Sequence, residues 1–159
     1  MTGESRAVPN AWPDLAGRIE GREHVLAVRV YYEDTDFSGI VYHANYLKYC
    51  ERGRSDFLRL LGVHHAALFD AEHAHERRGF AVARMDTTFH APARIDDVLE
   101  VRTRFTSLGG ARFGLHQEVA REGTLLFSAD LVAAVIDGNG RPQRLPDEMR
   151  TLFGRFVQG

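Results

Sequence analysis

Residues 28–61 read VRVYYEDTDFSGIVYHANYLKYCERGRSDFLRLL, and they carry the strongest structural pattern in the sequence. This stretch begins inside a longer run, HVLAVRVYY at residues 24–32, in which β-branched and aromatic residues predict a strand buried on at least one face. Acidic residues then end the strand, and Ser38 with Gly39 supplies the chemistry of a turn. A helical pattern follows, so the stretch predicts a strand, a sharp turn and a long helix.

The helix is predicted to begin between His43 and Asn45 and to run to about Leu61, with Gly62 as the residue that stops it. Apolar and small residues recur at steps of four, three, four and four and so form one helical face: Tyr46, Cys50, Gly53, Phe57 and Leu61. Glycine in a helix costs about 1 kcal/mol relative to alanine. We therefore expect Gly53 to be compensated by a close approach of the helix to a sheet.

Four strand-like stretches follow the helix, at residues 80–90, 98–107, 112–121 and 125–136. Short linkers with turn signals separate them, which predicts antiparallel neighbours. Pro146 opens a short final helix. One amphipathic helix packed on an antiparallel sheet of five strands is an α+β arrangement that buries both surfaces. Dimerisation through the sheet edge is consistent with this arrangement, because one helix covers only one side of the sheet.

Composition narrows the function classes. The 159 residues carry a net charge of −2, with 20 basic against 22 acidic residues, and so lack the basic footprint of nonspecific nucleic-acid binding. The longest apolar runs are too short to cross a bilayer, so we do not expect an integral membrane protein. The only cysteine, Cys50, allows no intrachain disulfide and indicates a reducing, cytoplasmic compartment. Residues 1–22 are predicted to be a partly ordered tail, and residues 23–159 a single domain.

Two carboxylates, Asp34 and Asp36, lie just before the predicted helix N-terminus. Free amides at such a terminus can stabilise an oxyanion, and an adjacent carboxylate can attack a carbonyl or deprotonate water. The alternative is that both aspartates are turn residues or helix N-terminal charges. His64, His65, His73 and His75 superficially suggest a metal site, but their spacing does not place them on one helical face and no metal is predicted.

The stretch at residues 31–58 resembles the signature of the hotdog-fold 4-hydroxybenzoyl-CoA thioesterase family, and within it the Tol–Pal-associated acyl-CoA thioesterase branch (YbgC type). FHAPARIDDVLEV at residues 89–101 is similar to a second segment of that family. The resemblance covers residues 24–150. It implies a hotdog fold, in which a curved sheet wraps a long central helix, and a homodimer or homotetramer with active sites at the dimer interface. It also implies hydrolysis of an acyl-CoA thioester without a metal or organic cofactor.

By this resemblance Asp36 is the nucleophile or general base, and the backbone N–H of His43 polarises the thioester carbonyl. Asp34 is expected to be structural. The imidazole of His43 either acts on water or the leaving group, or only lines the pocket. Four residues are candidates for supporting roles: Gly39, Tyr42, Asn45 and Glu51. Glu51 is either a second-choice base or a salt-bridge partner of Arg52 or Arg54.

The basic run that holds nucleotide phosphates in the benzoyl-CoA enzymes is not matched in this sequence, where residues 108–112 read LGGAR. Arg78, Arg94 and Arg112 are the candidate contacts to CoA, and an acyl carrier protein thioester is the other candidate substrate. Two other functions stay open. One is a dehydratase or hydratase that pairs His43 with Glu51, and the other is a non-catalytic acyl-CoA-binding or scaffold module.

Overall fold

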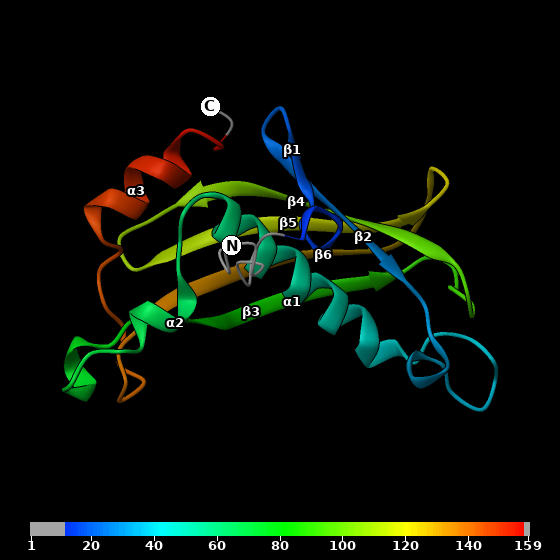
Figure 1. The fold of residues 1–159 in the computed structure, drawn as a ribbon, viewed down its shortest axis with the longest axis horizontal. Helices are drawn as coiled ribbons and strands as arrows, with labels where there is room; N and C mark the ends of the chain where they lie inside the picture. The colour runs from blue at the N-terminus through cyan, green and yellow to red at the C-terminus, as the bar shows by residue number, and fades with distance from the viewer. Residues whose placement is uncertain (1–11, 158–159) are drawn as a thin grey trace, which may run out of the picture.

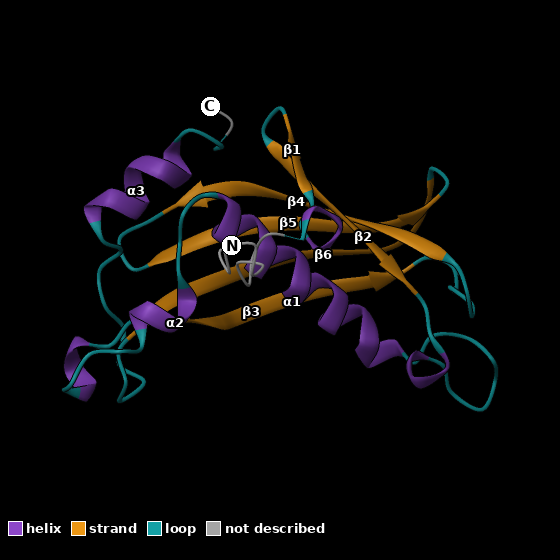
Figure 2. Cartoon of the chain, viewed as in Figure 1, coloured by secondary structure: helices purple, strands orange, loops and turns teal. Residues whose placement is uncertain are grey.

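The computed structural model describes residues 12–157. Its strands and α-helices follow one another along the chain as β1 (Arg18–Glu20), β2 (Glu23–Arg29), α1 (His43–Leu60), α2 (His65–Leu68), β3 (Gly79–Phe89), β4 (Val98–Leu108), β5 (Arg112–Arg121), β6 (Thr124–Ile136) and α3 (Asp147–Gly154). Figure 1 shows α1 crossing one face of the sheet, with α3 and α2 near one end of the strands. The architecture is α+β, as predicted (Figure 2).

The sheet is antiparallel throughout, with strand order β1-β2-β4-β5-β6-β3. It has six strands instead of the predicted five, because β1 forms within the segment assigned to the tail and pairs with β2. Residues 1–11 of that segment lie outside the described residues. The predicted strand at 24–32 ends earlier, at Arg29, because Tyr32–Asp34 forms a turn of 3₁₀-helix.

The buried face of α1 packs on the sheet around two groups of side chains. Tyr46, Tyr49 and Cys50 join the group that lies over β2, β4 and β6. Phe57 joins the second group, which includes Phe105 and Phe153 and lies toward α3. Gly53 sits between them, where a Cβ atom would lie 2.9 Å from Val101 Cγ1, so helix and sheet are in close contact as predicted.

The opposite face of the sheet carries polar and charged side chains. Arg104, His116 and Asp130 lie opposite one another on β4, β5 and β6. The His116 ring bonds Asp130 Oδ1 at 2.8 Å through Nδ1 and Glu118 Oε2 at 2.9 Å through Nε2, and these carboxylates raise the pKa of the imidazole against the opposing effect of burial. The apolar core therefore lies on the α1 side.

Among residues 12–157, no helix combines the length and apolar character needed to cross a bilayer.

Candidate active site

The loop between β2 and α1 is held against the helix by Asp34. Its carboxylate accepts the Tyr31 N–H at 2.8 Å, and its carbonyl accepts the Tyr42 N–H at 2.9 Å and the Asn45 side-chain N–H at 2.7 Å. Asp34 and Asn45 are both buried. Their hydrogen bonds lie within one chain and join the loop to the first turn of α1. Both side chains therefore have a structural role in this loop.

Asp36 differs from Asp34 in being exposed. Its backbone N–H donates to Ile40 O at 2.9 Å and its carbonyl accepts the Gly39 N–H at 3.0 Å, so the loop folds back on itself. Gly39 has φ +80°, a left-handed conformation that glycine adopts without steric cost. One carboxylate oxygen, Oδ1, accepts the Ser38 N–H at 2.8 Å. Within the described residues, the other oxygen of this carboxylate, Oδ2, accepts no hydrogen bond.

The N-terminus of α1 provides amide donors without acceptors. α1 begins at His43, and the N-cap residue Tyr42 makes no side-chain capping bond. Within the described residues, the amides of His43 and Ala44 have no hydrogen-bond acceptor, and no acidic residue lies in the first turn. Free amides and the aligned peptide dipoles make this end of the helix favourable for a developing negative charge.

Asp36 and His43 line the same cleft, which has a volume of about 380 Å³. The other walls come from the loop, from α1 and from the end of β3 with the segment after it: Ile40, Val41, Tyr46, Phe89, His90, Ala91 and Pro92. The His43 ring lies between Tyr42, at 4.5 Å between ring centroids, and Phe89, at 6.2 Å. Asp36, with its exposed carboxylate, and His43, whose backbone amide has no acceptor within the described residues, thus share a cleft with largely aromatic and apolar walls.

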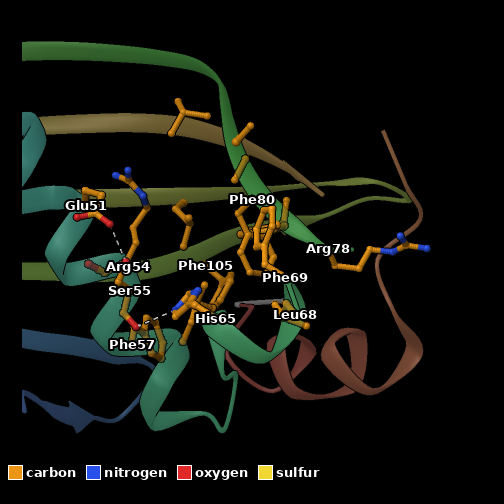
Figure 3. Close-up of a pocket in the computed structure, with 18 residues that line it drawn as sticks. Glu51, Arg54, Ser55, Phe57, His65, Leu68, Phe69, Arg78, Phe80 and Phe105 are labelled. Carbon is orange, nitrogen blue, oxygen red and sulfur yellow. Dashed lines mark hydrogen bonds between the residues drawn. The ribbon is translucent and has the colours of Figure 1, made fainter. Parts of the chain in front are cut away.

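A second pocket of about 230 Å³ lies along the C-terminal half of α1 (Figure 3). Most of its lining is apolar and comes from α1, α2, β3, β4, β5 and β6, while Glu51, Arg54 and Arg78 are its charged residues. Glu51 accepts the Ser55 hydroxyl at 2.8 Å. Within the described residues it forms no ion pair with Arg52 or Arg54, so the salt bridge considered for it is not found.

The three arginines that are candidate contacts to CoA do not line one common pocket. Arg78 lines the second pocket, but its guanidinium donates to the carbonyls of His75 and Arg77. Arg94 lies near the first cleft, where its backbone bridges Ile40. Arg112 is exposed and lines neither pocket, because it alternates with buried Phe113 on β5 and so faces away from α1.

The two pockets lie at opposite ends of β3. The first is lined by Phe89 and the residues after it, and the second by residues 78–82. Along α1, the rise from His43 to Glu51 is roughly 12 Å at 1.5 Å per residue. A short acyl group bound at His43 therefore does not reach the second pocket of the same chain.

Several features of the two pockets were not singled out from the sequence. Phe89, His90 and Pro92 belong to the FHAPARIDD segment, whose family likeness was the only available signal. Outside the two pockets, a buried hydrogen bond between His24 and Asp56, 2.7 Å between Nε2 and Oδ2, joins β2 to α1 across 32 residues, and no local pattern points to it. Of the histidines considered for a metal, His73 and His75 stack on each other. The described residues contain no group of three or more ligands suited to a metal ion.

Comparison with known proteins gives the family of the chain. Residues 30–153 match the family model described as the thioesterase-like superfamily. The chain is 42% identical over 133 residues to "Acyl-CoA thioester hydrolase YbgC" of Escherichia coli O6:H1, covering 82% of this chain and 93% of that protein. It is 35% identical to "Acyl-CoA thioesterase YbgC" of Haemophilus influenzae over 79% of this chain and 90% of that one.

Solved structures agree with this assignment. A probable thioesterase from Bartonella henselae is 42% identical, with a TM-score of 0.74 over 78% of this chain and 99% of that chain. A protein from Thermus thermophilus is 31% identical, with a TM-score of 0.75 over 86% of this chain and 99% of that chain. The hotdog fold predicted from residues 31–58 is confirmed, and the chain belongs to the thioesterase-like superfamily.

Proposed function

We propose that this protein is an acyl-CoA thioesterase that hydrolyses acyl-CoA to a free acid and CoA, with Asp36 and the His43 amide as its reacting groups. The observation that carries the proposal is the shared cleft of the exposed Asp36 carboxylate and the free amides at the start of α1. The names of the E. coli and H. influenzae relatives support the same substrate class. No cofactor is needed for this chemistry, because CoA is part of the substrate.

Asp36 can act in one of two ways. As a nucleophile, its carboxylate adds to the thioester carbonyl, the C–S bond breaks, CoA leaves as a thiolate that takes up a proton, and water then hydrolyses the mixed anhydride. As a general base, Asp36 takes a proton from water while the water oxygen adds to the carbonyl. The tetrahedral intermediate then collapses, the C–S bond breaks, and the departing CoA thiolate takes up the proton that Asp36 holds. In both routes the carbonyl oxygen becomes negatively charged, and the amide of His43 is the donor that stabilises it.

A homodimer formed through β3 completes the site in this proposal. β3 is the edge strand next to β6, it has eleven residues, and Val82 and Phe89 on it are exposed at 46% and 51%. A long exposed edge with apolar side chains is prone to pair with another strand. Two-fold antiparallel pairing brings the Phe89 end of one copy beside the Gly79 end of the other. The cleft of one copy then faces the second pocket of its partner, which receives the acyl group.

Light scattering on Val82→Asp tests the dimer. A charge on the β3 edge is expected to halve the mass of the particle, whereas Val98→Asp, at the same 46% exposure but on β4, is expected to leave the mass unchanged. A monomeric wild type, or a Val82→Asp variant with the wild-type mass, contradicts pairing through β3. A tetramer of the wild type that dissociates to its half in Val82→Asp agrees with it.

Thiol release from short, long and aromatic acyl-CoAs tests the reaction. Asp36→Asn keeps the size of the side chain but removes the carboxylate, and kcat is expected to fall by about 100-fold or more. Asp14→Asn is the control, because Asp14 is exposed in the turn before β1 and lines neither pocket. Turnover that survives in Asp36→Asn assigns the chemistry to another residue, and Glu51 is the next residue to replace.

The other two functions have less support. A hydratase needs a histidine and an acid at one site. Within one chain His43 and Glu51 line different pockets, so this reaction would depend on the proposed dimer to bring His43 of one copy toward the second pocket of the other. An enoyl-CoA hydration assay detects that activity directly. Saturable acyl-CoA binding without turnover supports a binding or scaffold role instead. We further propose a cytoplasmic location. The Tol–Pal context and the alternative of acyl carrier protein as thiol carrier are proposals that rest on the sequence resemblance.

A further inference from the structure

Arg54 lies on the side of α1 that faces the second pocket and is one of the few charged residues there (Figure 3). Much of the pocket lining is apolar, including Val82, Phe105 and Leu115, while the polar residues Glu51, Ser55 and Thr103 also line it. An arginine in such surroundings needs acceptors for its five N–H groups. The partners of the Arg54 guanidinium therefore indicate what the pocket can bind.

One N–H of Arg54 has a fixed partner in the core. The Arg54 Nη1 atom donates to Gln117 Oε1 at 2.8 Å. Gln117 is fully buried, and its Nε2 donates to the Cys50 carbonyl at 2.9 Å and to the Thr103 hydroxyl oxygen at 2.8 Å. Both N–H groups of the amide are thus used, which leaves its oxygen for Arg54. This network holds the guanidinium in one place on the pocket wall.

The remaining N–H groups of Arg54 have no protein acceptor within the described part of the chain. No carboxylate of residues 12–157 lies within 4.0 Å of its guanidinium, in contrast to Arg102 and Arg121, which pair with Glu23 and Asp97. Burial lowers the pKa of Arg54, as expected for a cation removed from water. Arg54 is only half-buried, so water reaches its free N–H groups, and an oxygen of a ligand in the pocket can take the place of that water as the acceptor.

The size of the pocket limits that ligand. At about 230 Å³ it is smaller than the roughly 300–1,000 Å³ cavities that enclose drug-sized molecules. The ring of Phe69 lies at its far end against Gly79, where a Cβ atom would be 2.3 Å from Phe69 Cε2. A short acyl group fits this space, and the Phe69 ring limits the length of a chain that enters it.

We propose that Arg54 is a specificity-determining residue, and that the second pocket binds short acyl groups carrying an oxygen to which Arg54 donates hydrogen bonds. The inference rests on the proposed thioesterase function and extends it to a substrate class. The oxygen belongs to a hydroxyl, a carbonyl or a carboxylate on the acyl chain. Glu51, on the same wall, favours the neutral groups over the carboxylate, because its own charge repels an anion.

Three CoA thioesters with four acyl carbons test the proposal: butyryl-CoA, 3-hydroxybutyryl-CoA and succinyl-CoA. The wild type is expected to have a kcat/KM for an oxygen-bearing substrate about 10- to 100-fold above that for butyryl-CoA, the range of a hydrogen bond to a charged group. In Arg54→Met this ratio is expected to fall toward one, and in Arg54→Lys to lie between. Comparison of 3-hydroxybutyryl-CoA with succinyl-CoA shows whether Arg54 favours a neutral hydroxyl oxygen or a carboxylate oxygen.

Arg52→Met is the matched control, because Arg52 lies two residues away on α1, is exposed, and lines neither pocket. Its ratio is expected to equal that of the wild type. A wild type without preference, or a preference that survives in Arg54→Met, overturns the proposal.

Calorimetric binding of the same three thioesters to Asp36→Asn separates this result from the proposed function. If the wild type hydrolyses none of them, the proposed hydrolysis of short acyl-CoAs fails, and the binding ratio with and without Arg54→Met still decides the role of Arg54. Arg54→Lys serves as the test variant if Arg54→Met does not fold. Equal affinities for all three thioesters overturn the proposal whether or not the protein turns them over.

Discussion

Replacing Gly53 by alanine has two opposing effects on the stability of the protein. Alanine is the better helix former, and at an interior position the change favours the helix by about 1 kcal/mol. At this position, however, a Cβ atom would lie 2.9 Å from Val101 Cγ1, 3.2 Å from Thr103 Oγ1 and 3.3 Å from Gln117 Nε2. The first of these distances is too short for two carbon atoms, so side chains of the sheet must move.

The cost of that movement exceeds the gain. Val101, Thr103 and Gln117 are fully buried, and overpacking of a dense core costs about 1–3 kcal/mol. If the Gln117 amide loses a hydrogen bond, the unmade bond costs a further 1–3 kcal/mol or so. After the helix gain is subtracted, overpacking alone is expected to lower the free energy of unfolding of Gly53→Ala by up to about 2 kcal/mol, and overpacking together with the lost hydrogen bond by about 1–5 kcal/mol.

Urea unfolding followed by circular dichroism at 222 nm measures this change. Gly154→Ala is the matched control, because it makes the same substitution at the end of α3, where the nearest side-chain atom to a Cβ is Leu108 Cδ2 at 4.0 Å. That variant is expected to be as stable as the wild type or slightly more stable. A Gly53→Ala protein that matches Gly154→Ala in stability refutes the close approach of helix and sheet.

Three further changes test other parts of the structure. Phe69→Ala opens the far end of the second pocket, so thiol release measured across acyl-CoAs of increasing chain length should shift toward longer acyl groups. An unchanged preference contradicts the position of Phe69 as the end wall of the pocket. Burial lowers the pKa of His24, so the folded state disfavours protonation of the imidazole, and the stability of the protein should fall as the pH drops below the ordinary pKa of 6.5. Urea titrations of His24→Gln should show a smaller loss of stability between pH 7 and 5 than those of the wild type. An equal loss in both proteins contradicts this role of His24. Burial raises the pKa of Cys50 to about 12, so iodoacetamide at pH 8 should label it only in urea, and labelling of native protein contradicts its burial.

The long helix and the four strands after it were predictable because each has a local pattern. The apolar steps along α1 and the stop at Gly62, which has φ +95°, placed both ends of the helix within two residues of His43–Leu60. β1 was missed because its three residues are all exposed and carry no alternation. Its place depends on pairing with β2 and on the hydrogen bond from the Gly17 N–H to Asp56 Oδ2, 39 residues away.

The first cleft of the candidate site was predictable from the sequence, but the second pocket was not. Asp36 and His43 are seven residues apart, and the turn at Gly39 is local, so the sequence could place both at one helix end. The second pocket joins residues from α1, α2 and the four strands β3–β6, and no window of sequence contains that set. Arg54 was seen only as a salt-bridge partner of Glu51, because its bond to Gln117 spans 63 residues.

The position of β3 also has a consequence for how the chain folds during synthesis. β3 precedes β4 and β5 in sequence, yet within the sheet it pairs with β6, whose last residue is Ile136. Pairings this distant in sequence form late, because the entropy of closing the intervening loop must be overcome first. During synthesis on the ribosome, β3 therefore remains unpaired until residues 124–136, which form its partner strand β6, have emerged. During that interval both of its edges are open, and a nascent chain of this length is expected to bind a chaperone or aggregate more readily than the finished protein.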